Sequence, residues 1–272
     1  MIKVKLIGNL GNQLFQLALA EIIKNETDET YLFDANDVKY QLGFFVTSNK
    51  ILESKYLFKI YNFLQKKLKF KNKIIDLDCS IENQITFSPK TYYVGYFQNA
   101  QILDIRREFL LNVLKVKQKH INHFKNKYAQ ILENQRFIVM SIRRGDYYTT
   151  DLKEYIGNSL LIPQTWYENQ LKNIEITDYK ILVISDDIEA VKLEFSNSLH
   201  DYIFINDDVI NQFLLLQHAD ICIIGNSTFA WWGAFLNSKT NRRVIAPKNF
   251  LGFNTGIELP KGIQTKFFEW VQ

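Results

Sequence analysis

The second half of the chain alternates short apolar, β-branched runs with stretches of helical periodicity, and this alternation strongly constrains the fold. The apolar runs lie at residues 137–142, 181–184, 202–205, 221–224 and 244–246. The stretches that predict helices lie at residues 164–173, 188–196, 209–218 and 228–238. Apolar runs separated by helices are typical of buried parallel strands. The sequence therefore predicts an α/β fold whose parallel sheet is covered by helices on both faces.

The first half of the chain begins in the same style and then loses its regularity. It predicts a strand at residues 3–7, a helix at 13–23 and a strand at 31–33. With 272 residues and 47% hydrophobic composition, the chain is long enough for about two domains. We place the boundary just before the strand at 137–142, which gives domains at residues 1–133 and 134–272. A lysine-rich amphipathic stretch at 52–73 predicts either a solvated helix face or a surface for a membrane or an anionic partner.

Composition excludes several classes of protein. The net charge of +4 arises from 33 basic and 29 acidic residues, so it does not indicate a nucleic-acid partner. The sequence contains neither a signal-peptide pattern nor an apolar run that could span a membrane, which predicts a cytoplasmic protein, at most peripheral to the membrane. Cys79 and Cys222 lie far apart, and Cys222 is expected to be a buried free thiol. No zinc-binding pattern is present.

Polar side chains cluster where three of the predicted strands end. In open α/β sheets, ligands bind outside the carboxyl ends of the strands. The residues that follow these three strands are Arg143, Arg144, Gly145 and Asp146, then Ser185, Asp186 and Asp187, and finally Gly225, Asn226, Ser227 and Thr228. Together they predict a single ligand site.

Each strand end suits part of a nucleotide diphosphate. Arginine binds phosphate through two parallel N–H groups. If the strand continues through them, two successive arginines point to opposite sides, so one could bind phosphate while the other pairs with Asp146 or another carboxylate. The helix start at 226–228 offers free N–H groups to an anion, although a simple N-cap explains it equally well. Asp186 could accept hydrogen bonds from guanine or ribose, or bind magnesium, and Asp187 is expected to begin the next helix.

Two other pairs are interpreted as structural. Trp231 and Trp232 are expected to pack under the sheet, because large aromatic side chains are usually buried. Arg242 and Arg243 precede a strand and therefore lie at its amino end, away from the predicted site.

The N-terminal stretch "GNLGNQ" carries a strand-to-helix turn with polar amides. Its spacing is not that of a dinucleotide fingerprint or a P-loop. Glycine at positions 8 and 11 lets a ligand approach the backbone, and Asn12 and Gln13 offer both donors and acceptors.

The motifs "GNLGNQLFQ", "IRRGDY", "SDD" and "NSTFAWWGAFL" occur in an order that closely resembles the inverting α-1,2-fucosyltransferases of bacteria, glycosyltransferase family 11. The resemblance implies a GT-B architecture, with two Rossmann-like domains whose parallel sheets face a central cleft. The N-terminal domain would face the acceptor, and the C-terminal domain would bind GDP-fucose. It also implies transfer of fucose to the 2-hydroxyl of a terminal β-galactose in a surface glycan of the O-antigen or lipopolysaccharide type, with no cofactor and no metal. Such an enzyme would work in the cytoplasm, peripherally on the inner face of the membrane.

The resemblance also implies roles for individual residues. Arg144 would be the catalytic arginine and, together with Arg143, would bind the diphosphate. Asp186 would meet guanine or ribose, and Asn12 would face the nucleotide sugar. The residues that would bind from the helix start are Asn226, Ser227 and Thr228. The chain departs from the family pattern at Ser141, where a histidine is usual, and at Asn9, where a glycine is usual.

The implied reaction follows from general chemistry. Departure of GDP builds negative charge on phosphate, which arginine and helix N–H groups would stabilise. A single displacement inverts the sugar without a protein nucleophile, and Asp146 or Asp151 would be the general base. The alternatives are a GT-B transferase with another donor such as GDP-mannose, or a non-catalytic module that binds nucleotides or polyanions.

Overall fold

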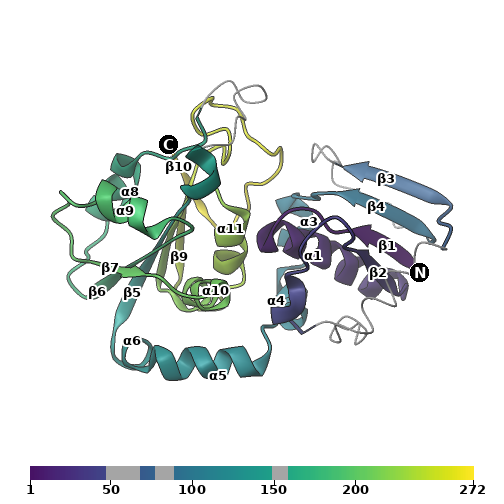
Figure 1. The fold of residues 1–272 in the computed structure, drawn as a ribbon, viewed down its shortest axis with the longest axis horizontal. Helices are drawn as coiled ribbons and strands as arrows, with labels where there is room; N and C mark the ends of the chain where they lie inside the picture. The colour runs from purple at the N-terminus through teal and green to yellow at the C-terminus, as the bar shows by residue number, and fades with distance from the viewer. Residues whose placement is uncertain (47–67, 77–88, 149–158) are drawn as a thin grey trace. The chain divides into compact units, whose positions relative to one another are not determined.

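The structure is a computed structural model, and it describes residues 1–46, 68–76, 89–148 and 159–272. The chain divides into two compact units, each with a parallel sheet and helices packed on it (Figure 1). The first unit comprises Met1–Lys117 and Pro260–Ile263, and the second comprises Gln118–Leu259 and Gln264–Gln272. The predicted α/β class with parallel sheets is confirmed.

The first unit has a four-stranded parallel sheet in the order β2-β1-β4-β3. Its strands are β1 (Ile2–Lys5), β2 (Tyr31–Asp34), β3 (Asn72–Asp76) and β4 (Thr91–Gly95). Its helical elements are α1 (Leu10–Thr27), η1 (Leu42–Phe44), α3 (Ala100–Asp104) and α4 (Arg107–Val113). Val4 and Phe33 of the strands and Leu14 and Ile22 of α1 are buried. The strands and the helix predicted at the N-terminus are therefore confirmed, with shifted ends.

The second unit has a six-stranded parallel sheet in the order β10-β9-β8-β5-β6-β7. Its strands are β5 (Arg136–Ile142), β6 (Tyr179–Ser185), β7 (Tyr202–Ile205), β8 (Ile221–Ile224), β9 (Arg243–Pro247) and β10 (Glu269–Val271). Its helices are α5 (Gln118–Lys127), α6 (Ala129–Asn134), α8 (Gln164–Lys172), α9 (Ile188–Glu194), α10 (Val209–His218) and α11 (Thr228–Phe235), and a 3-10 turn η3 (Gly145–Tyr148) follows β5. All five strands and four helices predicted for this half of the chain are present, with ends shifted by at most three residues.

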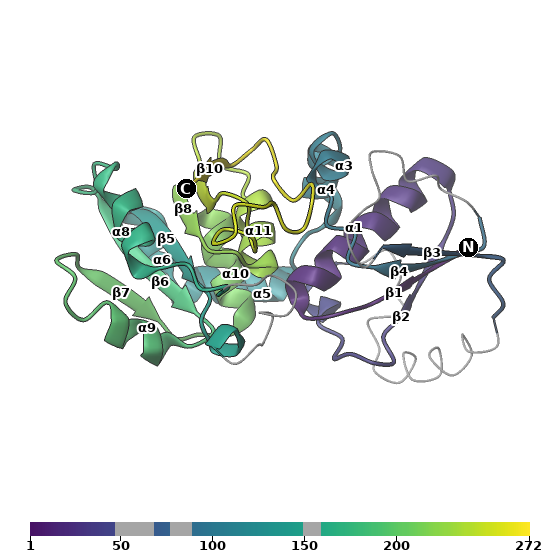
Figure 2. The ribbon, with the colours of Figure 1, turned by 90° about the horizontal axis from the view of Figure 1, so that it is seen from above.

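Helices cover both faces of this second sheet. Alternate residues of β5, Ile138, Met140 and Ile142, share one core with Trp166 of α8 and Val191 of α9. Figure 2 shows α10 and α11 on the other side of the sheet, where they pack against each other. The near-continuous apolar composition of the strands follows from this double coverage.

The division between the units falls after Lys117, ahead of the boundary expected at residues 133 and 134. The reason is that α5 and α6 pack on the second unit before its first strand begins. Phe124 of α5 is fully buried, and its ring centroid lies 5.1 Å from that of His218 on α10. The Tyr128 hydroxyl donates a hydrogen bond to the Asp207 carboxylate at 2.7 Å. The helices that lead into the first strand thus belong with the sheet that follows.

Several structural predictions are confirmed. Trp231 and Trp232 are fully buried, and Cys222 is a buried free thiol. Arg243 lies at the amino end of β9 and donates two hydrogen bonds, of 2.7 and 2.8 Å, to the Glu269 carboxylate of β10.

Two predictions concern the membrane. Most of the lysine-rich stretch at 52–73 lies outside the described residues, so its proposed surface role stays a prediction. Within the described ranges, no helix combines the length and the apolar composition that a membrane span requires.

Candidate functional site

The second sheet has a reversal point between β5 and β8. The chain adds β6 and β7 on one side of β5 and then returns to place β8 on the other side. Open α/β sheets bind ligands outside the carboxyl ends of strands at such a reversal. β5 ends at Ile142 and β8 at Ile224, so Arg143 and Gly225 both emerge here. The sequence motifs that predicted a ligand site therefore lie where the topology favours one.

Gly225 ties the two strand exits together. Its N–H donates to the Ser141 carbonyl at 2.8 Å. A Cβ atom at this position would lie 2.5 Å from the Tyr167 hydroxyl oxygen and 3.2 Å from the Ser141 carbonyl oxygen. The tight exit predicted at Gly225 thus arises from close packing, and any side chain would displace the Tyr167 hydroxyl and crowd the Ser141 carbonyl.

Arg143 lies between two carboxylates. Its Nε and Nη2 atoms lie 3.0 and 2.8 Å from Oδ1 of Asp146, and Nε lies 3.2 Å from Oδ2 of Asp186. The side chain is 25% exposed. Burial alone would lower the pKa of Arg143, but the hydrogen bond to Asp146 and the charge of Asp186 outweigh it and raise the pKa. Arg143 is thus a fixed positive charge that solvent and ligands can reach.

Arg144 has a different environment, because its side chain is buried. Its Nε donates to both Glu194 carboxylate oxygens at 2.8 and 2.9 Å, and its Nη2 donates to Oε2 at 2.8 Å. Its Nη1 donates to the Arg143 carbonyl at 2.9 Å. The residue is only 2% exposed. A phosphate could reach this guanidinium only if Glu194 moved away.

Burial and hydrogen bonding shift the pKa values of Arg144, Glu194 and Tyr148. Burial alone would lower the pKa of Arg144, but the Glu194 carboxylate outweighs it and raises the pKa. Burial alone would raise the pKa of Glu194, but hydrogen bonds from Arg144 and Tyr148 outweigh it and lower the pKa. Burial and the hydrogen bond to Glu194 raise the pKa of Tyr148 to about 12. All three groups therefore keep their protonation state around neutral pH.

The end of β6 supplies two aspartates with separate tasks. Asp186 accepts the Arg144 backbone N–H at 2.9 Å through Oδ1, and it packs so close to Gly145 that a Cβ there would lie 2.3 Å from Oδ2. Asp187 accepts the Ala190 N–H at 3.1 Å and begins α9, as predicted. Asp186 is brought to Arg143, while its predicted contact with guanine or ribose stays a prediction.

The start of α11 lies at the end of β8. Asn226 is buried, its amide donates to the Leu160 carbonyl at 2.7 Å, and this amide is therefore engaged within the fold. Ser227 occupies the N-cap position, but its hydroxyl makes no capping hydrogen bond. Ser227 and Thr228 are half-buried, and the structure gives the N–H groups of Thr228 and Phe229 no partner among the residues it describes. These donors suit an anion.

Three residues of the site were not predicted: Tyr147, Tyr167 and Glu194. The Tyr147 hydroxyl donates to the Asn226 carbonyl at 2.9 Å, and its ring centroid lies 5.5 Å from the Arg143 guanidinium. Tyr147 therefore links the arginine loop to the start of α11. Glu194 is the last residue of α9, and a negative charge is unfavourable at the C-terminus of a helix. This position was the sequence signal that Glu194 has a positively charged partner elsewhere in the fold.

The first unit holds the predicted amide cluster at the carboxyl end of β1. Oδ1 of Asn12 accepts a hydrogen bond from Nε2 of Gln98 at 3.0 Å. Gln13 is fully buried, and its Nε2 donates to the carbonyls of Gly8 and Lys39 at 2.9 and 2.8 Å. Gln13 thus serves the fold. Asn12 is half-buried, and among the described residues no acceptor is found for its Nδ2 group.

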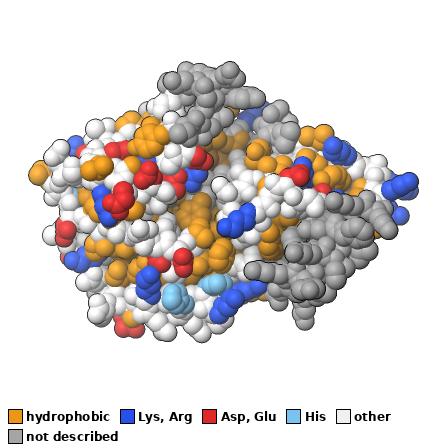
Figure 3. All heavy atoms as spheres, viewed as in Figure 1, with side chains coloured by type: hydrophobic (Ala, Val, Ile, Leu, Met, Phe, Trp, Pro, Cys, Tyr) orange, Lys and Arg blue, Asp and Glu red, His pale blue; other side chains and the backbone are white. Residues whose placement is uncertain are grey.

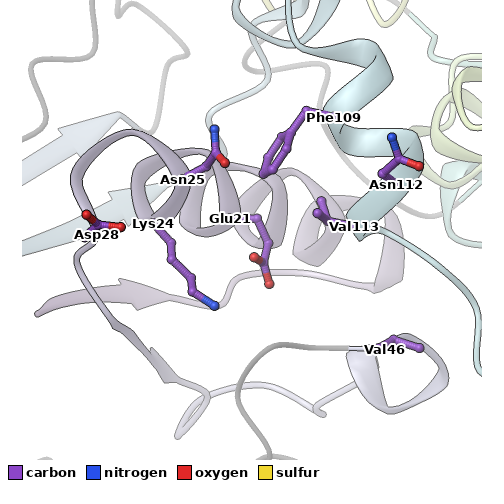
Figure 4. A pocket seen from close by; sticks show the side chains of 8 residues that line it. All are labelled: Glu21, Lys24, Asn25, Asp28, Val46, Phe109, Asn112 and Val113. Carbon is purple, nitrogen blue, oxygen red and sulfur yellow. The ribbon is translucent and has the colours of Figure 1, made fainter.

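A pocket of about 450 Å³ lies elsewhere in the first unit, between α1 and α4 (Figure 4). Glu21, Lys24, Phe109 and Asn112 are among the residues that line it. It adjoins the C-terminal half of α1 and contains none of the predicted site residues.

Asp151, predicted as a candidate base, lies outside the described residues. In the part of the chain that the structure describes, no group of three or more His, Cys, Asp or Glu residues is placed to bind a metal ion.

The chain is similar to known glycosyltransferases along nearly its whole length. The O-antigen biosynthesis glycosyltransferase WbnK of Escherichia coli is 27% identical over 313 aligned residues, which cover 93% of this chain and 96% of that protein. An alpha-1,2-colitosyltransferase of Escherichia coli is 26% identical over 272 aligned residues, with 91% of each chain covered.

Two solved structures share the fold at low sequence identity. POFUT1 in complex with GDP superposes with a TM-score of 0.56 at 12% identity, over 90% of this chain and 97% of that one. The fucosyltransferase NodZ from Bradyrhizobium gives a TM-score of 0.53 at 10% identity, over 86% of this chain and 91% of that one. The fold is of the GT-B type, as expected. Because the sequence model named "Glycosyl transferase family 11" matches residues 1–255, the chain belongs to this family and is a glycosyltransferase.

Proposed function

We propose that this glycosyltransferase transfers L-fucose from GDP-fucose to the 2-hydroxyl of a terminal β-galactose in a surface glycan, with inversion and without a metal. The observation that carries the proposal is the convergence of three strand ends around Arg143 at the reversal point of the second sheet. The relatives named as O-antigen and colitosyl transferases, and a similar fold solved with GDP, support the same kind of donor and product.

Arg143 is the arginine that we propose binds the diphosphate. Its guanidinium is partly exposed, whereas that of Arg144 is buried against Glu194. The N–H groups at the start of α11, with the hydroxyls of Ser227 and Thr228, would bind the same phosphates. These groups come from two adjacent strand ends, β5 and β8, that the Gly225 hydrogen bond and the Tyr147 hydroxyl tie together.

The proposed chemistry uses these donors in the transition state. As the bond from the sugar to GDP breaks, negative charge grows on the departing phosphate, and fixed donors then bind more strongly than in the ground state. The acceptor hydroxyl attacks from the opposite face of the sugar, which inverts the anomeric carbon. The hydroxyl proton must pass to a base, and Asp146 is the candidate among the described residues, because its side chain is 53% exposed beside Arg143.

The contact of Asp146 with Arg143 also fits a second role, in which the carboxylate orients the guanidinium. The two roles predict different kinetics. A base affects turnover and leaves GDP binding unchanged, whereas an orienting carboxylate affects both.

Three alternatives compete with this proposal. The relative named as a colitosyltransferase favours a donor that carries colitose, and GDP-mannose is another guanine-nucleotide donor. A non-catalytic polyanion-binding module would need a continuous basic surface. On the face shown in Figure 3, acidic and basic side chains are intermingled in the second unit, and on α9 Glu189 pairs with Lys192 at 2.7 Å. This mixture does not favour the polyanion-binding alternative.

Calorimetric titration with GDP and, separately, UDP in EDTA tests the proposal. We expect GDP to bind and UDP not to bind, because a guanine-specific, metal-free site is required. Incubation of GDP-fucose, GDP-colitose and GDP-mannose with a β-galactoside would then identify the sugar and the linkage. Equal binding of GDP and UDP, or no binding of either, would contradict the proposed donor.

A further inference from the structure

We propose that Glu194 is a positioning residue for the donor site: through the buried guanidinium of Arg144, it fixes the peptide group from which Arg143 extends. The inference rests on the proposed function, in which Arg143 binds the diphosphate. Glu194 itself would touch neither the phosphates nor the sugar.

The peptide group between Arg143 and Arg144 is bonded on both sides. Its carbonyl accepts a hydrogen bond from Nη1 of Arg144 at 2.9 Å, and its N–H donates to Oδ1 of Asp186 at 2.9 Å. The peptide plane cannot rotate without breaking one of these bonds, and a buried peptide group that loses its partner is costly. The direction in which the Arg143 side chain leaves the backbone is therefore fixed by these two contacts.

Glu194 keeps the Arg144 guanidinium in place for this contact. Three hydrogen bonds of 2.8 to 2.9 Å join the carboxylate to Nε and Nη2, and they leave Nη1 pointing at the Arg143 carbonyl. The Arg144 side chain is 3% exposed, so the Glu194 carboxylate is the charge that compensates its burial. Without the negative charge, the buried guanidinium would be unpaired and would turn toward solvent or another carboxylate. The bond to the Arg143 carbonyl would then be lost.

Glu194 also reaches the far end of the arginine loop. The Tyr148 hydroxyl donates to its Oε1 at 2.6 Å, and Tyr148 ends the η3 turn that follows Arg144. One carboxylate thus contacts both ends of the segment 144–148. Asp186, which binds the Arg144 N–H, lies just before α9, and Glu194 is the last residue of α9. The two carboxylates that contact Arg144 therefore come from opposite ends of the same helix.

A matched control residue exists on the same helix. Glu189 lies near the start of α9, is 73% exposed and pairs with Lys192 in an ordinary surface ion pair. Glu189→Gln and Glu194→Gln therefore make the same chemical change on one helix, but only the second removes a charge that holds Arg144.

The test is calorimetric titration with GDP in EDTA for the wild-type protein and both variants. We expect Glu194→Gln to weaken GDP binding by about 10- to 100-fold, by analogy with the effect of residues that orient the ligands of a metal ion. Glu189→Gln should stay within about twofold, as surface changes usually do. Unchanged GDP affinity in Glu194→Gln would overturn the inference.

A double-variant cycle separates positioning from general destabilisation. If Glu194 acts through Arg143, Glu194→Gln should cause no further loss of GDP affinity when Arg143 is already alanine. A loss that simply adds to that of Arg143→Ala would show an effect on the whole unit and would overturn the inference.

A milder variant covers the case in which Glu194→Gln does not fold. Tyr148→Phe keeps the ring and removes one hydrogen bond from the carboxylate, and it should weaken GDP binding by about threefold. In that case, unchanged affinity in Tyr148→Phe would overturn the inference. A wild-type protein that binds no GDP would refute the proposed function together with this inference, whereas wild-type binding with an insensitive Glu194 would refute the inference alone.

Discussion

Replacement of Arg143 by alanine is the perturbation that tests the proposed site most directly. In the structure this guanidinium is the partly exposed member of the arginine pair, with contacts of 2.8 to 3.2 Å to Asp146 and Asp186. The carboxylates that it contacts are partly exposed and lie outside the hydrophobic core, so the variant should fold. We expect GDP affinity to fall by about 100-fold, a magnitude that follows from the hydrogen bonds a phosphate would lose.

Arginine gives a phosphate two charge-assisted hydrogen bonds, each worth about 1.5–3 kcal/mol. Because Arg143 already bonds the Asp146 carboxylate and is 25% exposed, part of this energy is exchanged for existing bonds and part is screened by solvent. We therefore take the lower end, about 3 kcal/mol in total, which corresponds to a little more than 100-fold in the dissociation constant. Turnover should fall by a further 10²- to 10³-fold, roughly, because charge grows on the leaving phosphate.

The assay is calorimetric titration with GDP, followed by transfer kinetics, with thermal unfolding as the measure of folding. Arg243→Ala is the matched control, since Arg243 lies in the same unit, is 38% exposed and pairs with Glu269 at the amino end of β9, whereas Arg143 follows the carboxyl end of β5. GDP affinity of Arg143→Ala within about threefold of the wild-type value would refute the assignment, because even one charge-assisted hydrogen bond is worth more than that.

Three further predictions concern other parts of the second unit. Asp146→Asn should lower turnover by about 10²- to 10⁴-fold with GDP affinity within about threefold, as expected for a general base; a parallel loss of GDP affinity, seen by calorimetry, would show an orienting role instead. Gly225→Ala should lower the free energy of unfolding by about 1–3 kcal/mol, because its Cβ would lie 2.5 Å from the Tyr167 hydroxyl, and an unchanged melting temperature would contradict this. Burial alone would raise the pKa of Asp207, but hydrogen bonds from Tyr128 and other neighbours outweigh it and lower the pKa from 3.8 to about 2. The carboxylate therefore stabilises the fold above about pH 4, and up to about 2 kcal/mol is lost as the pH falls toward 2. Asp207→Asn should remove this dependence in denaturant unfolding at different pH values.

The fold was predictable because its signals are local. The strand at 137–142 and the helix at 209–218 follow from runs of apolar residues and their periodicity, and both appear within one residue of the expected ends. The domain boundary was less predictable. Whether α5 belongs to the first or the second unit depends on where Phe124 packs, and a helix with a single buried aromatic residue carries no sign of its partner.

The position of the site was predictable from the sequence, but the contacts of its individual residues were not. Strand ends and a helix start follow from the sequence, and topology then brings Arg143, Asp186 and Asn226 together. The sequence could not show that the Asn226 amide is used by the Leu160 carbonyl, since these residues are 66 positions apart. Contacts of this kind depend on the packing of loops, which leaves no local pattern.

The arginine pair shows why a motif alone does not assign a ligand. The two arginines are adjacent in the sequence, yet the Arg144 guanidinium is buried and the Arg143 guanidinium is partly exposed. The buried one, Arg144, needs a carboxylate partner, and Glu194, whose side chain is 28% exposed, supplies it from 50 residues away. Nη1 of Arg144 then donates a hydrogen bond to the Arg143 carbonyl, which couples the buried arginine to the partly exposed one. The two arginines therefore have different tasks, and substitution of either should weaken GDP binding: directly at Arg143, and through the peptide group between them at Arg144.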